Sequence, residues 1–297
     1  MAQGIKPSMP LPGRRHARTS HKEHMSQPER LTPEAHTQPV VYETLTSKSL
    51  FFSMKDVQSR MHILRPNELQ LDYTKIMMGF LLHNPNPCSI AMVGLGGGSL
   101  AKFCYRHLPQ CDITVVEINP HVIAHRDTFA VPPDDHRFTV RLADAAEYFR
   151  DTDEKFDIVL ADGFDIDGLP PALCTSQFYD DCYRALNPDG MLVANLHGCH
   201  PLFEVVADRL QASFHGALLV VDDPSATNRL AFSVKGGSRA LTSLAGVRCP
   251  HSFDATAWAD LLPSVARVFL ASRALARGGA ALAQHSESDS EQRDYGH

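Results

Sequence analysis

The stretch AMVGLGGGSLAKF, residues 91–103, places four glycines in five positions between an apolar run and a helical pattern. A strand that ends in glycines and opens a helix is typical of a nucleotide cradle, because the missing Cβ atoms allow a tight turn and let a ligand reach the backbone beside the helix N-terminus. The spacing nearly fits the dinucleotide fingerprint, but Ser99 stands where the third glycine or alanine belongs. A glycine-rich turn without a ligand is the competing interpretation.

Apolar runs with strand character alternate with helical patterns from this stretch onward. The runs are SIAMVG from Ser89, DITVVEI from Asp112, RFTVRLAD from Arg137, FDIVLAD from Phe156, GMLVANL from Gly190, GALLVVDD from Gly216 and RLAFSVK from Arg229. Apolar strands separated by helices predict a parallel sheet that is buried on both faces. We therefore expect a doubly wound α/β domain with a Rossmann-like, mostly parallel seven-stranded sheet. The last two runs, joined by a short turn, predict an antiparallel pair at its edge.

The residues before the glycines predict a smaller unit. Residues 40–54, VVYETLTSKSLFFSM, have the composition of strands, and a polar turn is expected after them. An amphipathic helix should follow, with an apolar stripe formed by Leu71, Ile76, Met77, Phe80 and Leu81.

The chain ends in one or two expected covering helices from about residue 253, interrupted at Pro263. The polar ends of the chain lack apolar periodicity and are expected to be disordered. The expected organisation is a disordered extension (1–38), a short N-terminal β segment (39–65), the Rossmann-like domain (66–236), a C-terminal linker with helices (237–283) and a disordered tail (284–297).

Composition limits the classes of partner. The chain has 297 residues, 43% of them hydrophobic, and a formal net charge of −6. This mild acidity argues against nucleic acid or an anionic membrane surface as a partner, and favours small molecules. We expect a cytoplasmic protein, because no apolar run reaches the eighteen or so residues of a membrane span and no secretion signal opens the chain. The seven cysteines include no C-x-x-C pair, which indicates reduced thiols.

Acidic residues follow the second and third predicted strands, at the sheet edge where open α/β folds bind ligands. Glu117 ends the second strand about twenty residues beyond the glycines, where a carboxylate can accept both hydroxyls of a ribose. Asp144 follows the third strand and can accept from an adenine amino group. It can equally cap the helix AAEYFR, and both interpretations stay open. The pattern indicates a nucleoside along the strand ends.

Three aspartates, Asp162, Asp165 and Asp167, follow the fourth predicted strand within six positions. Carboxylates this close repel one another unless a cation balances them. Hydride transfer needs no such cluster, whereas a sulfonium donor and an ammonium acceptor would. The alternative is a solvated turn that caps the next helix, which suits Asp167 beside Gly168 better than Asp162 at the tip of a buried strand.

The segments GLGGGSL, VVEINPHVI, LADAAEYF and FDIVLADGFDIDGLPPALCTSQFY together resemble the polyamine aminopropyltransferases, the spermidine and spermine synthases. That family has a class I S-adenosylmethionine-dependent methyltransferase-like fold. The resemblance covers about residues 57–235 and is most specific in residues 160–179, so the chain is similar to a divergent spermidine synthase-like member. It implies transfer of an aminopropyl group from decarboxylated S-adenosylmethionine to a small-molecule amine such as putrescine, without a metal. It also implies an oligomer such as a homodimer.

The resemblance also implies roles for particular residues. Asp162 would orient and deprotonate the attacking amine, and Asp165 would help to hold the ammonium end of the substrate or donor. Tyr73 and Gln58 occupy substrate-binding positions of the family. The nucleoside part of the donor would be bound by Gly94, Gly96, Gly98, Glu117, Asp144 and Ala145.

The chain departs from the family pattern at three places. The acidic stretch of T-E-R-D-E type that follows the glutamine in the family is absent after Gln58. Gly97 stands where the family usually has an aspartate that contacts the amino group of the donor. Tyr73, Thr74 and Lys75 replace a Tyr-His-Glu segment of the polyamine pocket, so a positive charge at Lys75 is expected there. Two alternatives therefore stay open: a methyltransferase that uses intact S-adenosylmethionine, and a catalytically idle nucleoside-binding relative.

The sequence NLHGCHP places His197, Cys199 and His200 just beyond the fifth predicted strand. This spacing suggests zinc, but a fourth ligand is missing from the pattern. Loop residues beside the pocket are the preferred interpretation.

Overall fold

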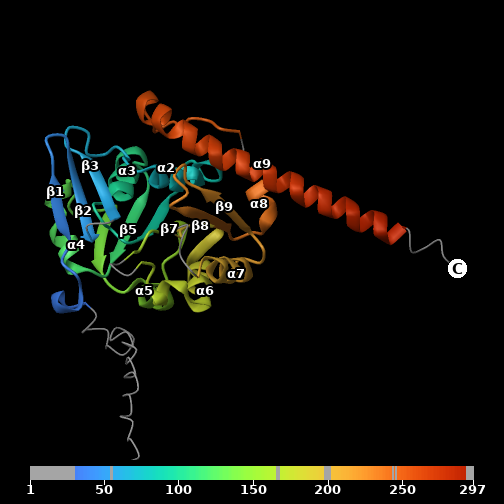
Figure 1. The fold of residues 1–297 in the computed structure, drawn as a ribbon, viewed down its shortest axis with the longest axis horizontal. Helices are drawn as coiled ribbons and strands as arrows, with labels where there is room; N and C mark the ends of the chain where they lie inside the picture. The colour runs from blue at the N-terminus through green and yellow to red at the C-terminus, as the bar shows by residue number, and fades with distance from the viewer. Residues whose placement is uncertain are drawn as a thin grey trace, which may run out of the picture.

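The computed structural model describes residues 31–53, 56–164, 168–196, 202–242, 244 and 246–291. These residues form a small N-terminal sheet, a central sheet covered by helices on both faces, and a long C-terminal helix (Figure 1). Among the described residues, no helix has both the length and the apolar character that are needed to span a membrane.

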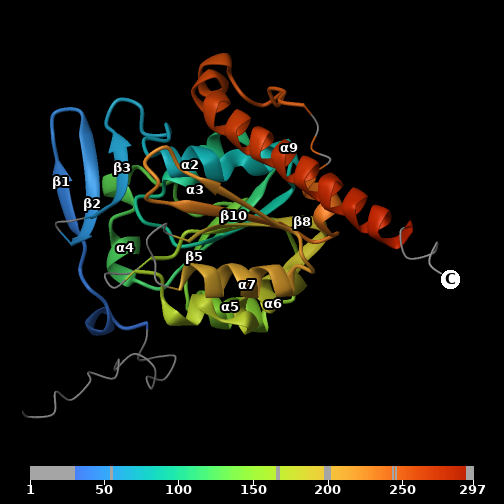
Figure 2. The ribbon, with the colours of Figure 1, turned by 45° about the vertical axis from the view of Figure 1, so that its right-hand side comes forward.

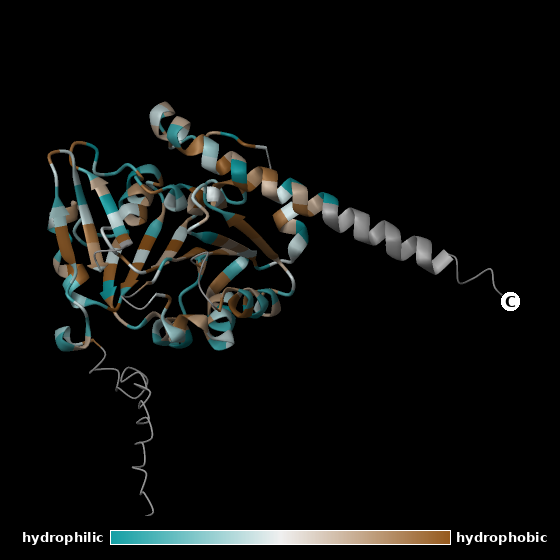
Figure 3. Ribbon diagram, in the orientation of Figure 1, coloured by the Kyte–Doolittle hydropathy of each residue, from teal (hydrophilic) through white to brown (hydrophobic). Residues whose placement is uncertain are grey.

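The central sheet confirms the predicted α/β fold. Its seven strands lie in the order β6-β5-β4-β7-β8-β10-β9, and β10 alone is antiparallel to its neighbours. Figure 3 shows hydrophobic residues along these strands, which helices cover on both sides. The strands are β4 (Ser89–Val93), β5 (Asp112–Glu117), β6 (Phe138–Leu142), β7 (Phe156–Ala161), β8 (Leu186–Asn195), β9 (Leu218–Asp222) and β10 (Arg229–Val234).

Helices lie on both faces of this sheet, with α5, α6 and α7 on one side and α2, α3 and α9 on the other (Figure 2). Side-chain caps start several of them: Asn119 accepts from the backbone N–H of His121, and Thr175 from that of Phe178. The α-helices are α2 (Asp72–Met77), α3 (Ser99–His107), α4 (Pro120–Ala124), α5 (Ala145–Asp151), α6 (Ser176–Ala185), α7 (Phe203–Ser213), α8 (Ser238–Thr242) and α9 (Ala255–Glu291). The 3-10 helices are η2 (Pro33–Ala35), η3 (Met78–Leu82), η4 (Asp127–Phe129) and η5 (Pro171–Cys174).

The N-terminal sheet contains a strand that the sequence pattern did not predict. Strands β1 (Val40–Glu43), β2 (Ser47–Ser53) and β3 (Asp56–His62) pair antiparallel in chain order. The polar turn expected after residue 54 is wrong, because β3 occupies that segment. Ser59 and Met61 are buried on one face of β3 while Arg60 between them is exposed, so a polar residue at an inward position hid the alternation.

The first residues described contact the body of the protein. The carbonyl of Thr37 accepts from Nδ2 of Asn119 at 3.0 Å, and the carbonyl of Pro33 lies 3.1 Å from Nε2 of His121. Residues 33–37 were predicted to belong to a disordered extension, and this assignment is wrong for them because these contacts hold them against the start of α4. Residues 1–30 of that predicted extension lie outside the described part.

The interruption expected at Pro263 is also wrong. Helix α9 passes through Pro263 and continues to Glu291, beyond residue 284, where a tail was predicted to begin. Proline removes the helical hydrogen bond to the carbonyl of Ala259, and its ring crowds that carbonyl. Leu261, Val265 and Val268 are all buried against the core, and this packing holds the helix together across the missing bond.

Candidate active site

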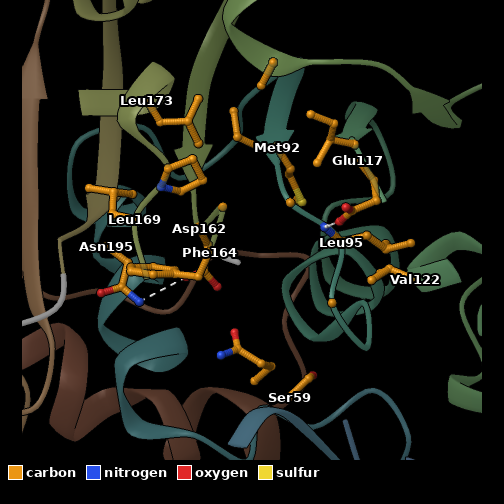
Figure 4. A pocket seen from close by; sticks show the side chains of 18 of the residues that line it. Ser59, Met92, Leu95, Glu117, Val122, Asp162, Phe164, Leu169, Leu173 and Asn195 are labelled. Carbon is orange, nitrogen blue, oxygen red and sulfur yellow. Dashed lines mark hydrogen bonds between the residues drawn. The ribbon is translucent and has the colours of Figure 1, made fainter. Parts of the chain in front are cut away.

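A cavity of about 1220 Å³ opens at the carboxyl ends of the parallel strands. Most of the residues predicted to form the site line it, and Figure 4 labels Glu117 and Asp162 among them. Those that line it are Gln58, Tyr73, Gly94, Gly96, Glu117, Asp144, Ala145 and Asp162. Gly98 does not line the cavity. Asp165 and Asp167, as well as His197, Cys199 and His200, lie outside the described residues.

The glycines of the loop between β4 and α3 are required by the packing of the protein itself. Gly94 has a φ of +90°, and a Cβ there would lie 2.5 Å from the carbonyl oxygen of Asp162. Gly98 has a φ of +66°, and a Cβ there would overlap the side chain of Val131. Only glycine adopts these conformations at so close an approach. The glycine loop is therefore held directly against the segment that carries Asp162.

Gly97, where the resembled family has an aspartate, has no room for a side chain. A Cβ at this position would lie 2.7 Å from Oγ of Ser59 and 2.9 Å from the ring of Phe129. Ser59 belongs to β3, so the N-terminal sheet closes the space that the missing side chain would need.

Glu117 at the end of β5 is 7% exposed and holds the glycine loop. Its carboxylate accepts from the backbone N–H of Leu95 at 2.7 Å and from that of Asn119 at 2.8 Å (Figure 4). Burial raises the pKa of Glu117, and the backbone donors oppose this shift. The side chain is therefore a buried acceptor that lies between the loop and the cavity.

Asp162 lies between two hydrogen-bond donors from different elements. Its Oδ2 accepts from the hydroxyl of Tyr73 at 3.1 Å. Its Oδ1 accepts from Nδ2 of Asn195 at 3.0 Å (Figure 4). Burial raises the pKa of Asp162 above its ordinary value, although both hydrogen bonds favour the carboxylate. Burial first, and then the Asp162 charge, raise the pKa of Tyr73. The arrangement is a fixed carboxylate with an increased affinity for a proton.

Asn195 was not predicted from the sequence. It stands at the carboxyl end of β8, next to the end of β7 in the sheet. The rule that identified Glu117 and Asp144, a polar residue at the end of a buried strand, applies to it equally.

Asp144 has the capping role that the sequence left open. Its carboxylate accepts from the backbone N–H of Ala146 at 2.9 Å and so caps α5. The residue is 5% exposed and, together with Ala145, it lines the cavity.

Lys75 contradicts the expectation of a positive charge in the pocket. Its Nζ forms an ion pair with Asp260 of α9 at 2.8 Å, and it does not line the cavity. Neighbouring Thr74 is buried, lines the cavity and donates from its hydroxyl to the carbonyl of Leu71. The side chains of Tyr73 and Thr74 therefore contribute to the pocket, whereas that of Lys75 faces α9.

The loop between β9 and β10 forms another wall that sequence reasoning missed. Asp223, Ser225, Thr227 and Asn228 line the cavity. The Asp223 carboxylate accepts from the backbone N–H groups of Thr227 and Asn228 and from the Ser225 hydroxyl. Burial raises the pKa of Asp223, but these hydrogen bonds outweigh it and the net pKa is lowered. Asp223 thus stabilises a wall of hydroxyl and amide groups.

The family model for the spermine/spermidine synthase domain matches residues 71–222. This chain belongs to that family. The polyamine aminopropyltransferase of Chromobacterium violaceum is 37% identical over 196 residues, which cover 66% of this chain and 74% of that protein. The matched region contains the glycine loop, Tyr73, Glu117, Asp144, Asp162 and Asn195.

Solved structures share the fold at lower identity. A probable spermidine synthase from Corynebacterium glutamicum is 17% identical with a TM-score of 0.59, over 76% of this chain and 82% of that one. A spermidine synthase in complex with the transition state analogue AdoDATO is 19% identical with a TM-score of 0.53, over 76% and 84%. At these identities the likeness concerns the fold alone.

Proposed function

We propose that this chain is a spermidine synthase-like aminopropyltransferase. It moves an aminopropyl group from decarboxylated S-adenosylmethionine to a primary amine such as putrescine and releases methylthioadenosine. Membership of the spermine/spermidine synthase family supports this reaction, as does the name of the relative that is 37% identical. The observation that carries the proposal is the Asp162 carboxyl between Tyr73 and Asn195 at the cavity, with its raised pKa.

The reaction needs a base for the acceptor. An amine with a pKa near 10 is almost fully protonated at neutral pH, and it attacks only after losing a proton. In our proposal the proton moves to the Asp162 carboxylate, whose raised pKa favours this step. The amine nitrogen forms a bond to the aminopropyl carbon, and the carbon–sulfur bond breaks. Its electron pair returns to sulfur, which becomes a neutral thioether.

Placement of the amine nitrogen in line with the aminopropyl carbon accounts for much of the remaining rate increase, because a sulfonium is already a good leaving group. The hydrogen bonds from Tyr73 and Asn195 fix both carboxylate oxygens of Asp162, and so they fix the line along which the amine approaches. Gln58 and Tyr73 are proposed to contact the substrate, since both line the cavity.

The nucleoside half of the donor is proposed to lie along the ends of β4, β5 and β6. Glu117 has oxygens that accept one backbone hydrogen bond each, and a carboxylate oxygen has capacity for more, so ribose hydroxyls fit there. Gly94 and Gly96 line the cavity beside it, and at Gly96 a Cβ would meet only Ser59 at 3.7 Å, so a ligand can approach the backbone there. Asp144 and Ala145 lie where the adenine would reach the start of α5.

The geometry weakens the idea of an idle relative. The hypothesis of an inactive relative rested in part on a positive charge of Lys75 in the pocket. Lys75 instead forms an ion pair with Asp260 and does not line the cavity.

The test is product detection by mass spectrometry. The purified chain is incubated with decarboxylated S-adenosylmethionine and a mixture of putrescine, cadaverine, spermidine and agmatine. We expect one aminopropylated amine and an equal amount of methylthioadenosine. Asp162→Asn should slow the formation of both by about 10²- to 10⁴-fold, whereas the matched control Asp153→Asn, at an exposed position, should leave both unchanged.

A parallel incubation uses intact S-adenosylmethionine. Methylated product there, with no aminopropylated product in the first incubation, would replace the proposal by a methyltransferase. Binding of methylthioadenosine in a calorimeter without either product would leave only a nucleoside-binding protein.

A further inference from the structure

A second cavity, of about 310 Å³, lies beside α3 and shares no lining residue with the active-site cavity. Three of its lining side chains are cationic, Lys102, Arg106 and Arg137, and none is acidic. Lys102 and Arg106 belong to α3, and Arg137 immediately precedes β6. The cavity therefore collects positive charge from two elements of a chain whose net charge is −6.

Lys102 is a buried cation with little neutralisation. It is 1% exposed, and its Nζ donates to the carbonyl of Phe129 at 2.7 Å. An ammonium group has three hydrogens to donate, and within the described residues this carbonyl is its one acceptor. Burial lowers the pKa of Lys102 to about 8, so the side chain is still largely charged at neutral pH. Such a group is costly to bury unless an anion accompanies it.

Arg137 presents a second unsatisfied donor. Its guanidinium carbon lies 3.6 Å from the ring centroid of Tyr105, and its Nη2 donates to the Tyr105 carbonyl at 2.7 Å. Its Nη1 is buried and has no hydrogen-bond partner in the described part of the chain. Buried donors are nearly always paired, so this atom needs an acceptor such as an ordered water or a bound anion.

The two carboxylates that shortly precede Arg137 in the chain are engaged elsewhere, and the charge of Arg106 helps to lower the pKa of Asp254. Asp135 accepts from the hydroxyl of Tyr105 at 2.8 Å and from the backbone N–H of Arg137 at 2.9 Å. Asp134 forms an ion pair with Arg126 at 2.7 Å. Neither carboxylate lines the cavity, and neither forms an ion pair with its three cations.

We propose that this cavity is a binding site for a small molecule that carries a phosphate group. A phosphate offers several strong acceptor oxygens to donors that converge from different directions, and it suits guanidinium and ammonium groups together. The cavity has the volume of about ten water molecules at about 30 Å³ each, which leaves space for a short carbon chain besides the phosphate.

The site lies behind the glycine loop. Phe129, whose carbonyl receives the Lys102 hydrogen bond, packs against Gly97, and Val131 packs against Gly98. Between them Ala130, a residue with a side chain, adopts a φ of 54° in the wall of the cavity. Strained backbone of this kind gathers at ligand sites.

Titration calorimetry tests the proposal on the full chain at pH 7 and constant ionic strength, with saturating methylthioadenosine to block the active-site cavity. The probes are inorganic phosphate, glycerol 3-phosphate and malonate. We expect phosphate to bind, and Arg106→Gln to weaken its binding about tenfold. Lys102→Met should weaken it further. Arg273→Gln, which removes an exposed arginine of α9, should change nothing.

Tighter binding of glycerol 3-phosphate than of phosphate would assign the site to a phosphorylated metabolite, and equal binding would assign it to free phosphate. Binding of malonate as tight as that of phosphate would overturn the phosphate class. Phosphate binding that is absent, or equally strong in Arg106→Gln, would overturn the site itself. Arg106 is exposed, so this variant gives an answer even where Lys102→Met does not fold.

Discussion

Asp162→Asn changes one carboxylate oxygen to an amide nitrogen and leaves the size of the side chain almost unchanged. The variant can no longer accept the proton of the acceptor amine. Positioned general bases contribute about 10²- to 10⁴-fold, so we expect kcat to fall by that factor. In the wild type, kcat should rise with pH through the raised pKa of Asp162, and this acid limb should disappear in the variant.

The expected effect on stability is small, and its sign changes with pH. Asp162 accepts two hydrogen bonds, and asparagine keeps one acceptor and places a donor at the other position. Tyr73 or a rotated Asn195 amide can accept from that donor, so the loss is about 1 kcal/mol or less.

Because the pKa of Asp162 is raised in the folded state, the folded protein binds this proton more tightly than the unfolded chain. The contribution of Asp162 to the free energy of unfolding is fully present at pH values below its pKa in the unfolded chain. It is lost as the pH rises through its pKa in the folded protein. Asparagine does not titrate, so the variant should gain stability relative to the wild type as the pH rises above 4.

Urea denaturation at pH 4 and pH 7 measures the stability difference, and steady-state kinetics measure kcat. The reasoning is refuted if Asp162→Asn keeps more than a third of the wild-type kcat. It is equally refuted if the free energy of unfolding of the variant is several kcal/mol lower at pH 7, because the Asp162 carboxylate would then be needed mainly for stability.

Three further outcomes are expected. Glu117→Gln should weaken methylthioadenosine binding about 10- to 100-fold in a calorimeter, because a neutral amide replaces a charged acceptor; unchanged affinity would remove the ribose role. Gly98→Ala should lower the free energy of unfolding by about 2 kcal/mol or more in urea, from its left-handed φ and the overlap with Val131 together. Lys75→Met should change stability by less than about 1 kcal/mol and leave the KM for the amine unchanged, whereas a changed KM would place Lys75 in the pocket.

The sequence was sufficient for the central sheet and insufficient for its surroundings. Strands that are buried on both faces of a parallel sheet are apolar throughout, so the strand segments that begin between Ser89 and Arg229 can be predicted from the sequence. Ser59 lies on the buried face of β3. Because this inward position is polar, the sequence lacks the alternation of apolar and polar residues that predicts a strand. The course of α9 through Pro263 depends on packing against the core, which no local pattern contains.

The site was predictable where strand ends determine it. Glu117, Asp144 and Asp162 follow β5, β6 and β7, and topology alone places them on one cavity. The direction of Lys75 depends on Asp260, which lies 185 residues further along the chain. The cavity wall around Asp223 depends on hydrogen bonds within the β9–β10 loop, which no local pattern predicts. The need for glycine in the loop after β4 comes from contacts with segments that are far away in the sequence.

The close approach of Gly94 to Asp162 couples the two halves of the site. The backbone N–H of Asp162 donates to the carbonyl of Val93 at 2.9 Å, so the glycine loop and the segment that carries Asp162 are in direct contact. Under the proposed function, a mutation that shifts residue 94 to accommodate an altered donor is expected to shift Asp162 as well. Directed evolution toward new nucleoside donors would therefore have to proceed through positions such as Leu95 and Ser99, while selection for new amines would act on Thr74 and Asn228.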